Sequence, residues 1–74
     1  MRTYKLSVVI EKDSDGYFAY CPELQGCYTQ GDTYEEVLEN VKDAMKLHIR
    51  DKIASGEEIP HIELINLTSV EVTV

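Results

Sequence analysis

Residues 13–41, DSDGYFAYCPELQGCYTQGDTYEEVLENV, decide the fold, because the hydrophobic period changes inside this stretch. Before residue 31 the apolar residues come in short runs separated by turn-forming residues, a pattern typical of β-strands. After residue 33 they recur every three or four positions, as they do on one face of a helix. The stretch therefore predicts paired strands that lead directly into a helix.

Three strands are expected in the first thirty residues. Residues 3–11 alternate between apolar and mostly polar side chains, which predicts a half-buried strand. Residues 13–16 form a turn, because Asp side chains cap nearby backbone amides and glycine accepts a positive φ. Strands at 17–21 and 27–30 follow, separated by residues 22–26, whose proline and glycine interrupt a ladder. The short connections predict an antiparallel meander.

One long helix is expected after the strands. Thr33 and Glu36 have the spacing of a capping box, and apolar residues continue from there at helical intervals. The pattern predicts a helix from Tyr34 to Ala54, with Gly56 as its stop signal.

A fourth strand is expected at the end of the chain, where Val70, Val72 and Val74 alternate with polar residues. Strand-to-strand crossovers through a helix are right-handed, which places this strand most simply parallel to and beside the first. The predicted fold class is α+β in the order β-β-β-α-β, a mixed four-stranded sheet with one helix on one face.

A single helix leaves the other face of the sheet uncovered. That face, which includes Val9, must meet water or another molecule. Tyr20 and Tyr28 are the better candidates for the uncovered face, and Tyr4 and Tyr34 are the better candidates for the core. The alternation of side chains along a strand does not by itself decide which face the helix covers. Because small domains often compensate by associating, we expect a homo-oligomer.

Length and charge exclude several functions. The 74 residues, with 14 acidic and 7 basic side chains and a net charge of −7, predict one domain over residues 1–74 without a C-terminal DNA-binding module. Such an acidic chain is not expected to bind nucleic acid directly. No apolar run approaches the roughly 20 residues of a membrane span, and no signal peptide is evident. We therefore expect a cytoplasmic protein without a membrane partner.

The acidity is concentrated in residues 11–39, where eight acidic residues stand against one base, while the remainder of the chain is balanced. The helix macrodipole favours anions in the first turn and explains part of this excess. A patch of one sign also steers and selects a protein partner. Both explanations stay open at this point.

Groupings typical of catalysis are missing from the pattern. No serine has an organised base, and His48 lies beside the apolar helix stripe. Cys21 and Cys27 are expected to be reduced thiols, since a zinc site needs four ligands at short paired spacings. Asp13 and Asp15 are better explained by the turn than by a two-metal site. We expect no catalytic residue, metal or cofactor, and hence no enzyme.

Five motifs resemble, in order and spacing, the HicB-like antitoxin family of type II toxin–antitoxin systems, and the similarity extends from Tyr4 to Pro60. The chain is most similar to the short, single-domain members, since longer members append a DNA-binding module. The resemblance implies a partial RNase H-like fold without nuclease activity. It also implies a partner, a small basic HicA-type toxin that cuts mRNA and is occluded by the antitoxin. The motifs are DSDGY at 13–17, CPELQGC at 21–27, QGDTYEE at 30–36, LENV at 38–41 and GEEIP at 56–60.

The resemblance and the charge together suggest an interface. A toxin that cuts mRNA needs a basic active face, so an acidic inhibitor would compete with RNA for it. Aromatic rings with a polar edge add area that suits a protein partner. The alternatives are an orphan protein-binding or assembly module of the same fold with no toxin partner, and a residual metal-dependent nuclease. The interface candidates are Tyr20, Glu23, Tyr28, Glu35 and Glu39.

Overall fold

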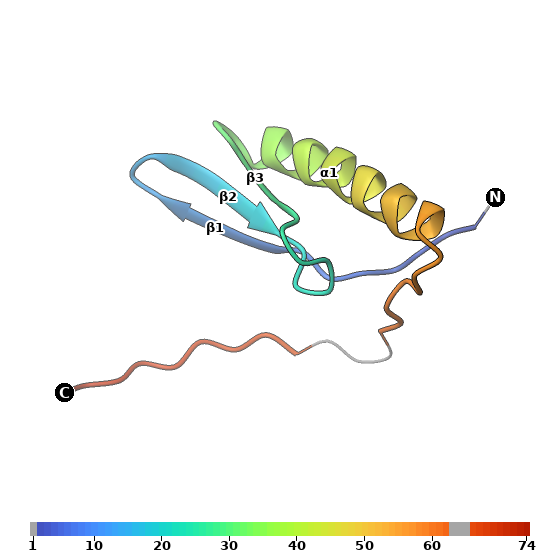
Figure 1. Cartoon of the computed structure of the whole chain (residues 1–74). Helices are drawn as coiled ribbons and strands as arrows, with labels where there is room; N and C mark the ends of the chain where they lie inside the picture. The colour runs from blue at the N-terminus through green and yellow to red at the C-terminus, as the bar shows by residue number, and fades with distance from the viewer. Residues whose placement is uncertain (1, 63–65) are drawn as a thin grey trace.

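The protein is described by a computed structural model that covers residues 2–62 and 66–74. Its strands β1 (Val9–Asp13), β2 (Gly16–Tyr20) and β3 (Tyr28–Gly31) form one antiparallel sheet in the order β1-β2-β3. The helix α1 (Tyr34–Ala54) lies across one face of this sheet (Figure 1). The predicted α+β class and the antiparallel meander are confirmed.

The turn between β1 and β2 forms as the sequence predicts. The carboxylate Oδ1 of Asp13 accepts a hydrogen bond of 2.7 Å from the backbone N–H of Asp15. Gly16 has a φ of +132°, which few other residues adopt, and it pairs with Asp13 to close the hairpin.

The helix begins and ends at the predicted residues. The hydroxyl of Thr33 accepts from the backbone N–H of Glu36 at 3.0 Å, while the carboxylate of Glu36 accepts from the N–H of Asp32 at 3.3 Å. This is a variant of the capping box, because the Glu36 side chain bonds the N–H of Asp32, one residue before the N-cap, and not the N–H of Thr33 itself. At the other end Gly56 takes a φ of +75° and donates its N–H to the carbonyl of Ile53, so the chain leaves the helix there.

The core has two clusters because the helix is longer than the strands. A helix of 21 residues spans about 32 Å, whereas a strand of five spans about 17 Å. The strands therefore cover only the first half of α1, where Ala19, Val37 and Val41 are buried together. The second half is covered by residues 21–27, whose Leu24 is 1% exposed.

Residues 21–27 form a compact connection between β2 and β3. The N–H of Cys21 donates to the carbonyl of Cys27 at 3.0 Å, and Leu24 donates to the carbonyl of Cys21 at 3.1 Å. Cys21 and Cys27 are free thiols, as predicted, and both are buried. Their hydrogen bonds hold the buried cluster of Cys21, Leu24 and Cys27 together, and Ala44, Met45 and Ile49 of the helix pack against this cluster.

Gly31 sets how closely the helix approaches the sheet. A Cβ atom built on this residue would lie 2.8 Å from the backbone nitrogen of Val37 and 3.0 Å from its Cα. The first turn of α1 can therefore rest against the end of β3 only because residue 31 has no side chain.

The first strand is shorter than predicted. β1 begins at Val9, and residues 2–8 are outside any strand, although the alternation begins at residue 3. The reason is the length of the partner strand. Val9 pairs with Tyr20, which is the last residue of β2, so the residues before Val9 have no partner in β2. Leu6 and Val8 still pack against the two core clusters, which explains the alternation.

The fourth strand expected near residues 69–74 is not found. Among the described residues the sheet has three strands, and residues 66–74 run alongside it as a separate arm (Figure 1). An alternating pattern forms a strand only where a neighbour completes the ladder, and here none does. The four-stranded mixed sheet and the RNase H-like arrangement are therefore not confirmed.

Tyr34 was expected in the core and is instead 49% exposed. It is the first residue of α1, at the end of the sheet, where its ring meets Tyr17 edge-on at a centroid distance of 6.4 Å. Tyr34 therefore packs against another aromatic ring at the border of the core and is not fully buried.

Candidate protein-binding face

The face of the sheet opposite α1 carries a row of apolar and aromatic side chains. Val9 pairs with Tyr20 in the β1–β2 register, and Tyr20 pairs with Tyr28 in the β2–β3 register. Their neighbour Ala19 points to the helix, so this row points away from it. Tyr20 is 40% exposed and Tyr28 is 75% exposed, which confirms that these two tyrosines lie on the uncovered face. We call this surface the open face.

A second row adds an acid to the open face. Glu11 pairs with Phe18, which in turn pairs with Gln30, and alternation places all three on the same side as Tyr20. Glu11 is exposed, whereas Phe18 is half-buried. The open face therefore presents aromatic surface, which is enriched in protein interfaces, beside a carboxylate that can select a partner of opposite charge.

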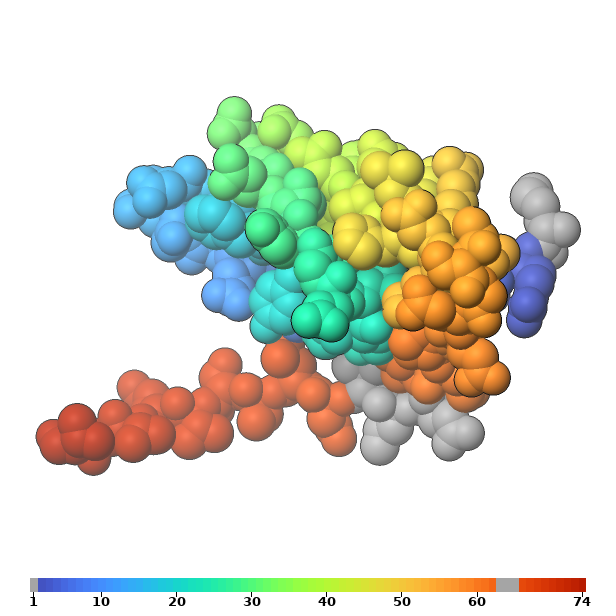
Figure 2. Space-filling model, in the orientation of Figure 1, coloured from blue at the N-terminus to red at the C-terminus, as the bar shows by residue number. Residues whose placement is uncertain are grey.

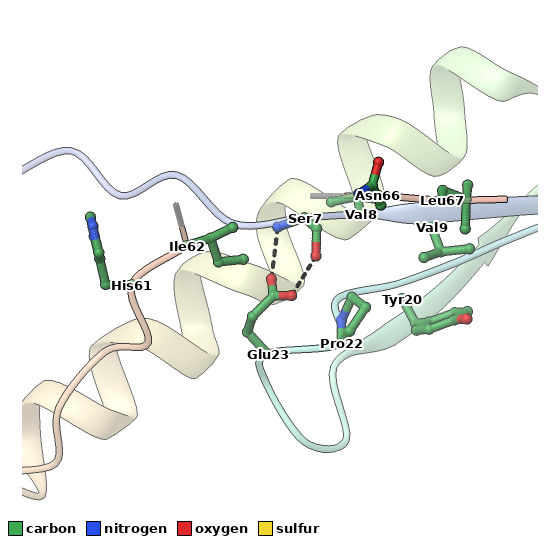
Figure 3. A pocket seen from close by; sticks show the side chains of 10 residues that line it. All are labelled: Ser7, Val8, Val9, Tyr20, Pro22, Glu23, His61, Ile62, Asn66 and Leu67. Atoms are coloured by element: carbon green, nitrogen blue, oxygen red, sulfur yellow. Dashed lines mark hydrogen bonds between the residues drawn. The ribbon is translucent and has the colours of Figure 1, made fainter. Parts of the chain in front are cut away.

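Glu23 lies at one end of the open face and is held in place by Ser7. Its carboxylate accepts from the backbone N–H of Ser7 at 2.7 Å and from the Ser7 hydroxyl, with the thiol of Cys21 at 3.7 Å (Figure 3). Burial acts to raise the pKa of this carboxyl, but the hydrogen bonds from Ser7 and Cys21 outweigh it, and the pKa is lowered. Glu23 is thus a fixed negative charge.

A groove of about 630 Å³ adjoins Glu23 (Figure 3). One wall comes from the sheet side, including Val9 and Tyr20, and the other from residues that follow the helix, including Ile62 and Leu67. It is open and mixes polar with apolar lining, so it extends the open face at its Glu23 end. The full lining is Ser7, Val8, Val9, Tyr20, Pro22, Glu23, His61, Ile62, Asn66 and Leu67.

Glu35 and Glu39 lie on the other side of the molecule. They are four residues apart on α1 and share its outer surface, opposite the buried Val37 and Val41. Both are exposed, and Glu39 is 3.5 Å from the ammonium group of Lys42, which partly balances its charge. The sheet separates them from Tyr20, so the five predicted interface residues form two groups and not one patch.

Three residues of this surface were not among the predicted interface residues. Val9 was expected on the uncovered face but was not named as an interface residue, and Glu11 and Phe18 join the same face through strand register; hairpin parity around the 13–16 turn was the signal that could have placed them. Ser7 was missed as the partner of Glu23 because 16 residues separate the two and no local pattern links them.

The remaining titratable groups form no reactive site in the part of the chain that the structure describes. Within residues 2–62 and 66–74 no group of three or more His, Cys, Asp or Glu side chains could hold a metal ion. His48 has its Nδ1 atom 2.9 Å from the carbonyl oxygen of Ala44, which satisfies it within the helix. Burial raises the pKa of both Cys21 and Cys27, which keeps them as unreactive thiols. No described helix is long and apolar enough to cross a membrane.

The family model for HicB-like antitoxins of bacterial toxin–antitoxin systems matches residues 6–72. The chain belongs to the HicB-like antitoxin family. A UPF0150 protein of Synechocystis is 44% identical over 63 residues, covering 84% of this chain and 80% of the relative. A UPF0150 protein of Helicobacter pylori is 52% identical over 46 residues, with 62% and 64% covered.

A solved structure supports the same family. The chain resembles one chain of a structure described as a HicA3 and HicB3 toxin–antitoxin complex, with a TM-score of 0.57 and 27% sequence identity. The match covers 73% of this HicB-like chain and 65% of the solved one, so the solved chain extends beyond the shared part. Membership of an antitoxin family indicates a non-enzymatic role in a toxin–antitoxin system.

Proposed function

We propose that this protein is an antitoxin that binds and occludes a small basic HicA-type toxin through its open face. The observation that carries the proposal is the uncovered row of Val9, Tyr20 and Tyr28 in a chain of the HicB-like family. A domain of this size leaves such a row exposed at a cost unless a partner covers it. Inhibition is steric and electrostatic, with no bond made or broken.

Charge gives the proposal its selectivity. A toxin that cuts mRNA must attract RNA and therefore carries a basic face, to which a chain of net charge −7 is complementary. Glu11 lies within the open face and Glu23 at its end, so both meet the toxin directly. A toxin that cuts mRNA acts where translation occurs, which places the complex in the cytoplasm.

The two acids on the helix have a different role in this proposal. Glu35 and Glu39 are on the far side of the sheet, about a Debye length or more from a toxin on the open face at physiological salt. They raise the rate of encounter at low salt and have little effect on the dissociation rate.

The test uses a HicA-type toxin, sought first as a small basic protein encoded beside this chain. Tyr28→Ala removes an aromatic side chain that is 75% exposed, so folding is unaffected, while binding weakens by at least about 30-fold if the ring is a central contact. The matched control is Tyr34→Ala, which removes an exposed tyrosine at the helix start. Affinity is measured by titration calorimetry, and relief of mRNA cleavage by adding each variant to the toxin.

Two results would reject the proposal. Equal affinity of Tyr28→Ala and the unmodified protein would move the interface away from the open face. A neighbouring basic protein that neither co-purifies nor is inhibited would leave the alternative, an assembly module of the same fold without a toxin partner.

A further inference from the structure

The carboxylate of Glu23 is fixed from two sides. Its backbone belongs to the 21–27 connection, where Leu24 donates its N–H to the carbonyl of Cys21 at 3.1 Å. Its side chain is held by Ser7, whose backbone N–H donates to Oε1 at 2.7 Å and whose hydroxyl donates to Oε2 (Figure 3). A side chain that is already held loses little rotamer freedom when a partner binds to it.

The groups that hold Glu23 leave its charge uncompensated. The amide and the hydroxyl of Ser7 are neutral donors, and the thiol of Cys21, 3.7 Å from Oε1, is kept neutral because burial raises its pKa. Among the described residues no Lys or Arg forms an ion pair with Glu23, whereas Glu39 pairs with Lys42 at 3.5 Å. Glu23 therefore combines a fixed position with a free negative charge.

One acceptor site of the Glu23 carboxylate stays open. A carboxylate offers about four lone-pair sites on its two oxygens. Within the described part of the chain, Oε1 accepts from the Ser7 N–H and from the Cys21 thiol, and Oε2 accepts from the Ser7 hydroxyl alone. Oε2 can therefore accept one further N–H, which an ammonium or a guanidinium group supplies.

The groove beside Glu23 suits the stem of a long cationic side chain. Its volume of about 630 Å³ is in the range of pockets that hold a small molecule, which is ample for one side chain. Val9, Tyr20 and Pro22 contribute apolar lining from the sheet side, and Ile62 contributes it from the opposite wall. Lysine and arginine lay their methylene groups along such a surface, and a tyrosine ring attracts the cationic head.

We propose that Glu23 and the groove beside it bind one cationic side chain of the toxin, and that Ser7 is the positioning residue that holds Glu23 for this contact. The inference rests on the proposed function, because it takes the toxin as the partner, and it adds one charge pair and the residue that orients it. A basic face that attracts RNA presents such side chains, and a preorganised carboxylate selects them.

The first experiment measures affinity for the HicA-type toxin by titration calorimetry. Glu23→Gln keeps the shape of the side chain and removes its charge, so binding is expected to weaken about tenfold at low salt and less at high salt. Ser7→Ala is expected to weaken binding at least about threefold, whereas Ser7→Thr keeps the hydroxyl and is expected to restore the affinity. Ser14→Ala, at an exposed serine of the 13–16 turn, is the matched control.

A double-mutant cycle separates positioning from a general structural role of Ser7. If Ser7 acts through Glu23, Ser7→Ala is expected to cause no further loss of affinity in the Glu23→Gln protein. A second cycle combines Glu23→Gln with replacement of each toxin lysine or arginine by methionine. Coupling of at least about threefold is expected with one of these residues, which identifies the cation as an ammonium or a guanidinium.

Carboxyl NMR of the free protein tests the role of Ser7 without any toxin. Burial raises the pKa of Glu23 and the bonds from Ser7 lower it, so Ser7→Ala is expected to raise this pKa toward its ordinary value, while Ser7→Thr leaves it low. The other titratable groups of the groove, Tyr20 and His61, and the thiol of Cys21 are the same in all variants. The difference between variants therefore reports on Ser7.

Each failure has its own signature. Unchanged affinity of Glu23→Gln, beside weakened binding by Tyr28→Ala, would overturn this inference and leave the proposed function standing. Equal losses from Ser7→Ala with and without Glu23→Gln, or an unchanged Glu23 pKa in Ser7→Ala, would overturn the role of Ser7. Coupling to no single toxin cation would overturn the charge pair, and a toxin that the unmodified protein does not bind would reject both. Helical circular dichroism verifies that each variant is folded.

Discussion

Gly31→Ala is expected to destabilise the protein by pushing the helix away from the sheet. The added Cβ would lie 2.8 Å from the nitrogen of Val37 and 3.0 Å from its Cα, and a helix backbone cannot yield as a flexible side chain does. Overpacking of this kind costs about 1–3 kcal/mol. Reduced freedom of the unfolded chain returns about 0.4–1 kcal/mol, so the middle of the two ranges gives a net loss of about 1.3 kcal/mol.

The loss corresponds to a fall in Tm of roughly 5–10 °C for a domain of this size, measured by circular dichroism during heating. Gly56→Ala is the matched control, because no atom lies within 4 Å of its added Cβ and the only penalty comes from its φ of +75°. Amide shifts are expected to change around Val37 and Ala19 in the first variant, and only at the end of the helix in the second. An unchanged or higher Tm for Gly31→Ala would refute the close approach of β3 and α1.

Three further predictions concern single contacts. Glu23→Gln is expected to lose roughly 1 kcal/mol at neutral pH. Because folding lowers the Glu23 pKa, this advantage of the carboxylate disappears as the pH falls through the folded pKa, so the stabilities of the two proteins in urea unfolding should converge as the pH is lowered. Thr33→Ala is expected to cost about 1 kcal/mol by removing the cap, whereas Thr33→Ser retains it, and equal urea midpoints for the two would contradict the cap. Cys21 and Cys27 are expected to react with a thiol reagent at least about tenfold more slowly in the native protein than in urea, and similar rates would mean that they are not buried.

The helix could be predicted to the residue because its signals are local. Thr33 and Glu36 mark the start, Gly56 marks the end, and the apolar spacing between them continues for 21 residues. The hairpin at 13–16 was predictable for the same reason, since Asp13 caps its own turn.

Features that depend on a distant partner could not be predicted in this way. The alternation at residues 3–11 is uninterrupted, but β1 starts only where Tyr20 provides a neighbour. The valines of the arm likewise have a strand pattern without a strand beside them. An alternating sequence determines which face of a strand would be apolar. A hydrogen-bonded ladder forms only where a neighbouring strand is present.

The candidate site was predictable only in part. Parity puts Tyr20 and Tyr28 in one row once the register is known, and the structure leaves that row uncovered. The side of the sheet on which α1 packs is a tertiary property, so the sequence could not separate Glu35 and Glu39 from the tyrosines.

The two short connections of the sheet differ in what they tolerate. Asp13, Ser14 and Asp15 are exposed, and their turn touches neither core cluster. The connection at 21–27 instead buries Leu24 against the second half of α1. Length variation, peptide insertion and fluorescent labelling therefore belong at the 13–16 turn, while a single residue added between Cys21 and Cys27 would withdraw Leu24 and uncover half of the helix.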